Sequence, residues 1–166
     1  MSTKFDAEKA ENLDEIEKQF VPLESRALFS LINLAEDTYR LIQTYWQLLE
    51  AVPPKALKLT KMDEDIYNDF LEQFPEYKEN PSMVEVIDED LLKSKENKQR
   101  WFKFMSAYEK KVQDYTFGSL LRVDVKDDYT EKNTMFVPRM QFYVFEIARN
   151  RLGMNDHVYN SAKSSK

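Results

Sequence analysis

The chain has 166 residues, 42% of them hydrophobic and 13% aromatic, which is enough apolar mass to fold around a core. It has no cysteine and one histidine, so the composition excludes disulfides, thiolate metal sites and a cysteine nucleophile. The formal net charge of −6 is the opposite of what a general nucleic-acid binder shows, and two glycines are too few for a glycine-rich phosphate-binding loop.

The N-terminal segment, residues 1–24, is polar and acidic, and a capping box at Asn12 and Glu15 predicts one short helix in it. Acidic residues stand where a signal peptide has its apolar core, and no run of about 18 apolar residues is present. We therefore expect a cytoplasmic monomer without nucleic-acid or membrane contacts. Residues 25–156 should form a single helical domain, and the polar residues 157–166 a disordered tail.

Apolar residues at three- and four-residue spacing predict a long amphipathic helix over Arg26–Glu50, which Pro53 ends. Apolar residues recur every four positions over residues 62–74, which predicts a second helix, and residues 76–87 are predicted to form a loop. A third apolar stripe runs over Trp101–Tyr115. Several lysines lie mostly off this stripe and are typical of a solvated face rather than a nucleic-acid site: Lys95, Lys98, Lys103, Lys110 and Lys111.

After Gly118 the helical spacing of apolar residues is replaced by apolar residues at alternate positions. Leu120–Val125 places apolar and β-branched residues at alternate positions, which is typical of a short strand, and Thr134–Val137 can pair with it antiparallel. Irregular backbone is the alternative, and spacing leaves both open. The predicted fold class is mainly α: a single-domain bundle of four to five helices, with this small β-hairpin before the last helix.

The most unusual stretch is Pro138–Gly153. Proline suits the first position of a helix, and glycine suits the left-handed conformation that ends one. Apolar side chains surround almost the whole helix, which is typical of a buried helix. Several polar residues are nevertheless set into it: Arg139, Gln141, Glu146, Arg149 and Asn150. A buried charge that lacks its partner costs roughly 3–5 kcal/mol, so these side chains need either partners or a surface.

Known catalytic and metal-binding patterns do not account for these residues. The lone His157 cannot supply a zinc site without cysteines or a second histidine, and it follows the last predicted helix. The acidic runs at residues 63–65 and 88–90 stand at helix starts, where the helix dipole explains them, and the pair at 127–128 stands in a turn. We therefore predict no catalytic, cofactor-binding or metal-binding residues, and a protein that is not an enzyme.

Five residues of the hairpin and the last helix remain as a candidate site: Arg122, Arg139, Glu146, Arg149 and Asn150. Arg139 and Glu146 lie two helical turns apart on one face, and Glu146 reaches positions 149 and 150 at i+3 and i+4. One interpretation is a buried ion-pair network that ties the hairpin to the helix. The other is a surface cluster that grips a partner. The sequence leaves both open.

These same segments resemble a known eukaryotic family. The resemblance is carried, in order, by Phe117–Asp124, Tyr129–Glu131, Phe136–Phe142 and Glu146–Gly153, together with Tyr45-Trp46, Leu57–Lys61 and Trp101. The family is catalogued as polysaccharide biosynthesis domain-containing protein 1, with fungal and animal members, and the resemblance covers roughly residues 39–156.

The resemblance implies a dedicated chaperone of newly made translation elongation factor 1-alpha. Such a protein engages the GTP-binding domain of its client as the client leaves the ribosome, with the ribosome as a further contact, and is released when that domain folds with GTP. The nucleotide would belong to the client, so no cofactor is expected. An acidic chaperone suits a basic client. Two alternatives stay open: an enzyme or accessory protein of polysaccharide biosynthesis, as the family label suggests, and a general translation-associated scaffold.

Overall fold

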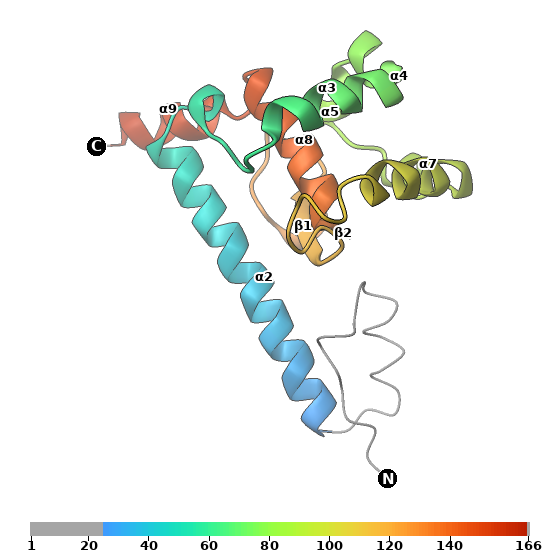
Figure 1. The fold of residues 1–166 in the computed structure, drawn as a ribbon. Helices are drawn as coiled ribbons and strands as arrows, with labels where there is room; N and C mark the ends of the chain where they lie inside the picture. The colour runs from blue at the N-terminus through green and yellow to red at the C-terminus, as the bar shows by residue number, and fades with distance from the viewer. Residues whose placement is uncertain (1–24, 166) are drawn as a thin grey trace.

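A computed structural model describes residues 25–165 of the chain, so the short helix predicted within residues 1–24 lies outside the described residues. The first described element is the long helix α2, Ser25–Ala51, whose N-terminal half projects away from the rest of the molecule (Figure 1). Its C-terminal half is anchored through the buried Ile42, Tyr45 and Leu49. Proline cannot continue the helix, and Pro54–Ala56 forms a single 3₁₀ turn, η1.

Five helices follow: α3 (Asp63–Gln73), α4 (Pro75–Glu79), α5 (Ser82–Glu85), α6 (Glu89–Leu92) and α7 (Lys95–Ser106). The loop predicted over residues 76–87 is therefore wrong, because α4 and α5 occupy most of it. A proline stands at the first position of α4 and at the N-cap of α5, where a missing N–H is tolerated. The helix predicted through Tyr115 ends at Ser106 and gives way to turns.

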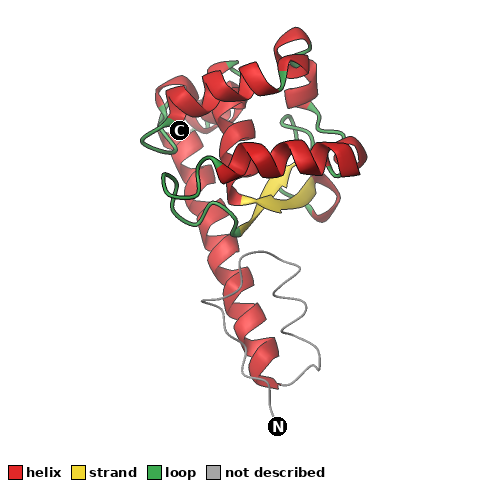
Figure 2. Cartoon of the chain, turned by 45° about the vertical axis from the view of Figure 1, so that its right-hand side comes forward, coloured by secondary structure: helices red, strands yellow, loops and turns green. Residues whose placement is uncertain are grey.

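The β-hairpin is confirmed. Strand β1, Gly118–Arg122, pairs antiparallel with β2, Thr134–Pro138, with Leu120 opposite Phe136. A short 3₁₀ turn, η2 (Glu131–Asn133), precedes β2. A Cβ atom on Gly118 would lie 2.1 Å from the ring of Phe136, so the start of β1 needs glycine for that ring to cross it. Figure 2 shows helices packed around this two-stranded sheet.

Helix α8, Arg139–Arg151, is the buried helix of the sequence prediction, and ten of its residues are buried. Its N-cap is Pro138, and Gly153 takes a φ of +77° just beyond its end. The predicted disordered tail is wrong for most of its length, because Asp156–Ser164 forms a further helix, α9. Helix α9 packs against α2 and buries Val158, which the polar composition of the segment concealed (Figure 1).

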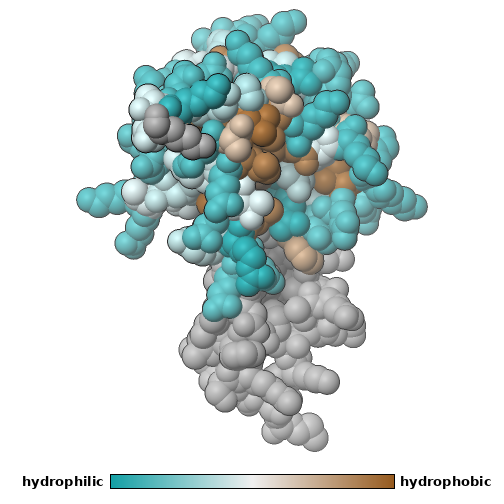
Figure 3. All heavy atoms as spheres, turned by 90° about the vertical axis from the view of Figure 1, so that its left-hand side faces the viewer, coloured by the Kyte–Doolittle hydropathy of each residue, from teal (hydrophilic) through white to brown (hydrophobic). Residues whose placement is uncertain are grey.

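The core is rich in aromatic rings from α3, α4, α7 and α8. Phe74 and Trp101 stack at 4.4 Å between ring centroids, and Phe70 and Phe145 pack around them. The face drawn in Figure 3 is largely polar, with an apolar patch near its centre and smaller apolar areas beside it. No described helix is long and apolar enough to cross a membrane. The predicted class is thus confirmed: the described chain is mainly α with a two-stranded hairpin before its final helices, and it has more short helices than expected.

Candidate functional site

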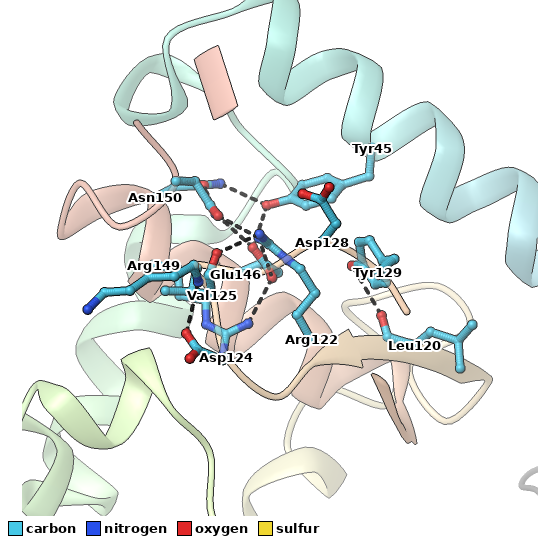
Figure 4. Close-up of polar contacts among 12 residues, drawn as sticks. Tyr45, Leu120, Arg122, Asp124, Val125, Asp128, Tyr129, Glu146, Arg149 and Asn150 are labelled. Atoms are coloured by element: carbon cyan, nitrogen blue, oxygen red, sulfur yellow. Dashed lines mark hydrogen bonds and ion pairs between the residues drawn. The ribbon is translucent and has the colours of Figure 1, made fainter. Parts of the chain in front are cut away.

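Four of the five predicted site residues meet in the interior. Arg122 ends β1, and Glu146, Arg149 and Asn150 lie on α8 (Figure 4). Arg122, Glu146 and Arg149 are 0% exposed, and Asn150 is 2% exposed. In this structure these four side chains therefore offer no surface to a partner.

The carboxylate of Glu146 is the centre of this group. Its Oε1 lies 3.2 Å from Nη1 of Arg149 and 3.6 Å from Nη2 of Arg122. Its Oε2 accepts hydrogen bonds from the hydroxyl of Tyr45 at 2.8 Å and from Nδ2 of Asn155 at 2.9 Å. Burial alone raises the pKa of Glu146, but the two guanidiniums and the two hydrogen bonds together bring that pKa below its ordinary value. The carboxylate is therefore charged at neutral pH.

Arg149 joins three parts of the chain that are distant in sequence. Its Nε donates to the carbonyl oxygen of Val84 at 2.9 Å, and Nη2 donates to that of Val123 at 3.2 Å and that of Glu85 at 3.4 Å. The predicted i+3 pair with Glu146 is also present. One side chain thus fixes α5 and the end of the hairpin against α8.

Arg122 occupies the opposite side of the carboxylate. Its Nη1 donates to the carbonyl oxygen of Val125 at 2.8 Å, and its Nη2 donates to Oδ1 of Asn155 at 2.5 Å. The guanidinium lies 5.2 Å from the ring centroid of Trp46 and 5.6 Å from that of Tyr129. The contact with Trp46 attaches the hairpin to α2 through cation–π attraction, and the ion pair with Glu146 attaches it to α8.

Sequence reasoning missed two members of this group. Asn155 is 0% exposed and donates to both Glu146 and Asn150, the latter at 2.7 Å. Tyr45 accepts from Nδ2 of Asn150 at 3.2 Å. Burial, and then the charge of Glu146, raise the pKa of Tyr45 well above its ordinary value, so its hydroxyl keeps the proton that it donates. Tyr45 belongs to the apolar stripe of the long helix and to the segments that carry the family resemblance, but neither pattern predicts its contact with Glu146. No spacing rule singles out Asn155.

Arg139 does not join the group. It lies 3.5 Å from Oδ2 of Asp114, and its guanidinium is 5.8 Å from the ring centroid of Phe117. Arg139 was predicted as a member of the candidate cluster, but the turns before β1 place Asp114 next to it instead. Asp114 itself has a φ of +58°, in the left-handed region. The Arg139 side chain is 19% exposed, so a partner contact by this residue stays a prediction.

We call the buried set the Glu146 network: Tyr45, Arg122, Glu146, Arg149, Asn150 and Asn155. It contains two guanidiniums and one carboxylate, and backbone carbonyl oxygens of Val84, Val123 and Val125 accept further guanidinium hydrogens. The Nε of Arg122 has no hydrogen-bond partner among the described residues. The network connects α2, α5, the hairpin, α8 and the start of α9. Of the two interpretations of the sequence, the buried ion-pair network therefore describes how these residues lie.

The surface of the described residues has several hollows of other chemistry. The largest of these, about 750 Å³, lies between the η1–α3 connection and α8 and is lined by Lys55, Lys58, Lys61, Asp63 and Glu64, among others. A groove along α2 and α9 consists of two hollows of about 620 and 520 Å³ that share Trp46, Gln47, Glu50 and Asp128. A pocket of about 290 Å³ lies between α7 and the hairpin.

The part of the chain that the structure describes contains no preformed metal-binding site. No group of three or more histidine, cysteine, aspartate or glutamate side chains there is placed to hold a metal ion. The exposed His157 lines the groove along α2 and α9 and stands apart from the Glu146 network.

Comparison with known proteins places this architecture in a family. The family model described as "PBDC1 protein" matches residues 32–160, which is most of the chain and includes every member of the Glu146 network. The chain belongs to the PBDC1 family. The family assignment agrees with the resemblance seen in the sequence, and the matched range extends it slightly at both ends.

Two yeast relatives in the PBDC1 family align over nearly the whole chain. The Protein PBDC1 homolog of Saccharomyces cerevisiae is 48% identical, and the alignment covers 95% of this chain and 97% of the relative. The homolog of Schizosaccharomyces pombe is 46% identical with the same coverage. Protein PBDC1 of Homo sapiens is 41% identical over 73% of this chain and 50% of the human protein.

A solved structure shares the fold. A solution NMR structure of a protein from Saccharomyces cerevisiae superposes with a TM-score of 0.74 at 47% sequence identity, covering 96% of this chain and 99% of that one. The PBDC1 family fold thus extends over the described helices and hairpin, with the Glu146 network inside it.

Proposed function

We propose that this chain is a co-translational folding chaperone for translation elongation factor 1-alpha, which engages the client's GTP-binding domain and leaves when that domain folds with GTP. The observation that carries the proposal is PBDC1 family membership over residues 32–160, the segments in which the sequence resembles the family with this activity. The protein would act as a cytoplasmic monomer close to the ribosome. It would need no nucleotide of its own, because the client supplies the GTP-binding site.

The groove along α2 and α9 is the surface that best suits such a client. Trp46 and Tyr39 offer aromatic surface, and Tyr39 is 60% exposed. Glu50 and Asp128 add negative charge beside these rings. Aromatic faces flanked by carboxylates attract arginine and lysine side chains as well as apolar ones, which suits a partly folded basic protein.

The alternative of a polysaccharide-modifying enzyme has less support. An active site needs convergent titratable groups that are free to react. In the largest hollow, Asp63 accepts hydrogen bonds from the backbone N–H groups of Leu59 and Thr60, both at 2.7 Å, and so shapes the turn before α3. The second carboxylate, Glu64, is 2.6 Å from Arg151. We therefore propose a binding protein rather than an enzyme.

Depletion of the protein from its own cells tests the proposed function. Newly synthesised polypeptides are pulse-labelled, and the protease resistance and solubility of new elongation factor 1-alpha are followed after depletion. The proposal predicts that new elongation factor 1-alpha becomes protease-sensitive and aggregates, while other new proteins behave as before. Normal folding of new elongation factor 1-alpha in depleted cells would overturn the proposal.

Variants returned to the depleted cells test the groove. Tyr39→Ala and Glu50→Lys change exposed side chains at the groove and should fail to restore client folding. Glu72→Lys makes the same charge change at an exposed position of α3 and should restore it fully. If all three variants restored folding equally, the client would bind elsewhere.

A further inference from the structure

The pocket between α7 and the hairpin is lined by an amide side chain that is free to bind. Gln141, on the first turns of α8, lines this pocket. Its side-chain amide forms no hydrogen bond with any other residue that the structure describes, and it is not among the buried polar atoms without a partner, so it reaches solvent through the pocket. The amide can both donate to and accept from a polar group that enters the pocket.

The remaining walls of the pocket are mostly apolar. Leu92, Met105 and Phe136 line it, and the absent side chain of Gly118 leaves room for the ring of Phe136. The volume of about 290 Å³ is small. Pockets for whole small-molecule ligands span roughly 300–1,000 Å³, so this one suits a single large apolar side chain better than a metabolite.

An exposed aromatic ring stands beside the opening. Phe102 is 71% exposed, the highest value among the large hydrophobic residues of the described chain. It follows Lys98 by four residues and precedes Met105 by three on α7, so the three share one helix face. Lys98 and Met105 line the pocket, which places Phe102 at its rim. An exposed aromatic residue next to a hydrophobic pocket is typical of a protein-binding surface.

The charged residues that line this pocket are all basic, in a chain of net charge −6. They are Lys93 and Lys98, and no acidic residue lines the pocket. Lys93 pairs with Glu89 at 2.8 Å, whereas Lys98 forms no ion pair with any other described residue. A partner that approaches this face is therefore selected for negative charge.

We propose that the pocket between α7 and the hairpin, together with Phe102, is a docking site for an acidic peptide segment of a partner protein. One large apolar side chain of that segment enters the pocket, and its backbone pairs with the Gln141 amide. Flanking carboxylates lie against Lys98 and Lys93. This site is separate from the acidic groove along α2 and α9, and it does not depend on the identity of the client. A chaperone for a basic client would use it for a different, acidic partner.

Titration of the full chain with synthetic peptides tests the proposal. The probe is a fluorescein-labelled peptide of sequence Asp-Glu-Asp-Phe-Asp-Glu, and fluorescence anisotropy reports its binding. Two comparison peptides replace the central phenylalanine by glycine, or all the acidic residues by lysine. We expect the probe to bind at least about tenfold more tightly than either comparison peptide, because it alone combines the apolar anchor with negative charge. Equal binding of the three peptides would overturn the proposal.

Surface variants locate the binding on the protein. Phe102→Ala and Lys98→Glu change exposed side chains, so neither should disturb the fold. Each should weaken probe binding about five- to tenfold. The matched control, Lys132→Glu, makes the same charge change on η2 and should leave binding unchanged. Undiminished binding to both Phe102→Ala and Lys98→Glu would overturn the proposal.

The Gln141 amide gives a readout that needs no mutation of the pocket. In ¹⁵N-labelled protein, its side-chain NH₂ signals should shift on addition of the probe peptide, whereas those of Asn155 in the Glu146 network should not. A single-stranded RNA oligonucleotide serves as a competing anion. Displacement of the probe by RNA at equal concentration, with no movement of the Gln141 signals by the peptide, would assign this face to nucleic acid and overturn the proposal.

Discussion

At the scale of single residues, Glu146 has the greatest influence on the interior. Its two oxygens face two arginines, one tyrosine and one asparagine, all buried. Without it, Arg122 and Arg149 would lie in the core with no opposing carboxylate. Removing one partner of a buried ion pair is far more harmful than replacing the whole set by apolar groups, because the remaining charge stays desolvated.

Glu146→Gln should therefore lower the free energy of unfolding by roughly 3–5 kcal/mol, because it removes the negative charge while keeping the shape of the side chain. Equilibrium urea unfolding followed by circular dichroism measures the change. Glu72→Gln, the same substitution at an exposed position of α3, is the control and should unfold like the original protein. Indistinguishable unfolding midpoints for the two variants would contradict a structural role for the Glu146 carboxylate.

Glu146 should also make stability depend on pH in the acid range. Its pKa in the folded protein lies below that of an ordinary glutamate. A group whose folded pKa is lowered stabilises the fold above its unfolded pKa, and this contribution disappears as the pH falls through the folded pKa. Between neutral pH and pH ~3 the original protein should thus lose more stability than Glu146→Gln. Unfolding curves of both proteins across this range give the difference in their free energies of unfolding. The other carboxylates are the same in both proteins, so their contributions drop out of this difference. Parallel declines would show that Glu146 is not held ionised by its arginines.

At the scale of elements, α9 is more important than its composition indicates. Deleting residues 157–166 removes most of α9, including the buried Val158, and uncovers the side of α2 on which α9 packs. We expect the deletion to reduce the free energy of unfolding by about 2 kcal/mol or more, the usual contribution of one buried valine. Thermal unfolding measures it, with deletion of residues 165–166 as the matched control. If the longer deletion were as harmless as the shorter, the segment would behave as the tail that the sequence predicts.

The sequence predicted correctly those elements and contacts that involve residues close together in the chain. The stripe of α2, the alternation of β1 and the i+3 pair of Arg149 with Glu146 all follow from residues close together in the sequence. The missed features depend on distant residues. The hydroxyl of Tyr45 meets a carboxylate 101 positions away, and no spacing rule reports such a contact. The same holds for Val158, a single apolar residue whose burial depends on where α2 lies.

The sequence predicted that four of the candidate residues lie together, but it could not predict whether they face the interior or the surface. Sequence reasoning brought together four side chains that do meet, since charges within an apolar helix require partners. It could not decide which way they point, because that depends on the packing of α2 and α5 over them. Arg139 was misplaced for the same reason: its partner Asp114 belongs to turns in which the sequence predicted a continuing helix.

At the scale of the whole molecule, charge is divided between surface and interior. Buried charged residues hold the elements together from inside, and the outer faces differ in sign: acidic side chains along the groove of α2 and α9, and basic ones along α7. A chaperone with two such faces can hold a basic client on one and an acidic partner on the other. Release of the client then depends on the difference in affinity between its unfolded and folded states.

Client release by GTP is the most direct test of the proposed chaperone. The denatured GTP-binding domain of elongation factor 1-alpha is diluted into fluorescently labelled protein, and anisotropy is followed as GTP with magnesium is added, with ATP as the control. We predict a complex that persists in ATP and dissociates in GTP, with roughly 100-fold weaker affinity for the folded domain, because a factor of that size is needed to turn a mostly bound client into a mostly free one. A complex that survives GTP, or that forms equally well with the native domain, would contradict the proposal.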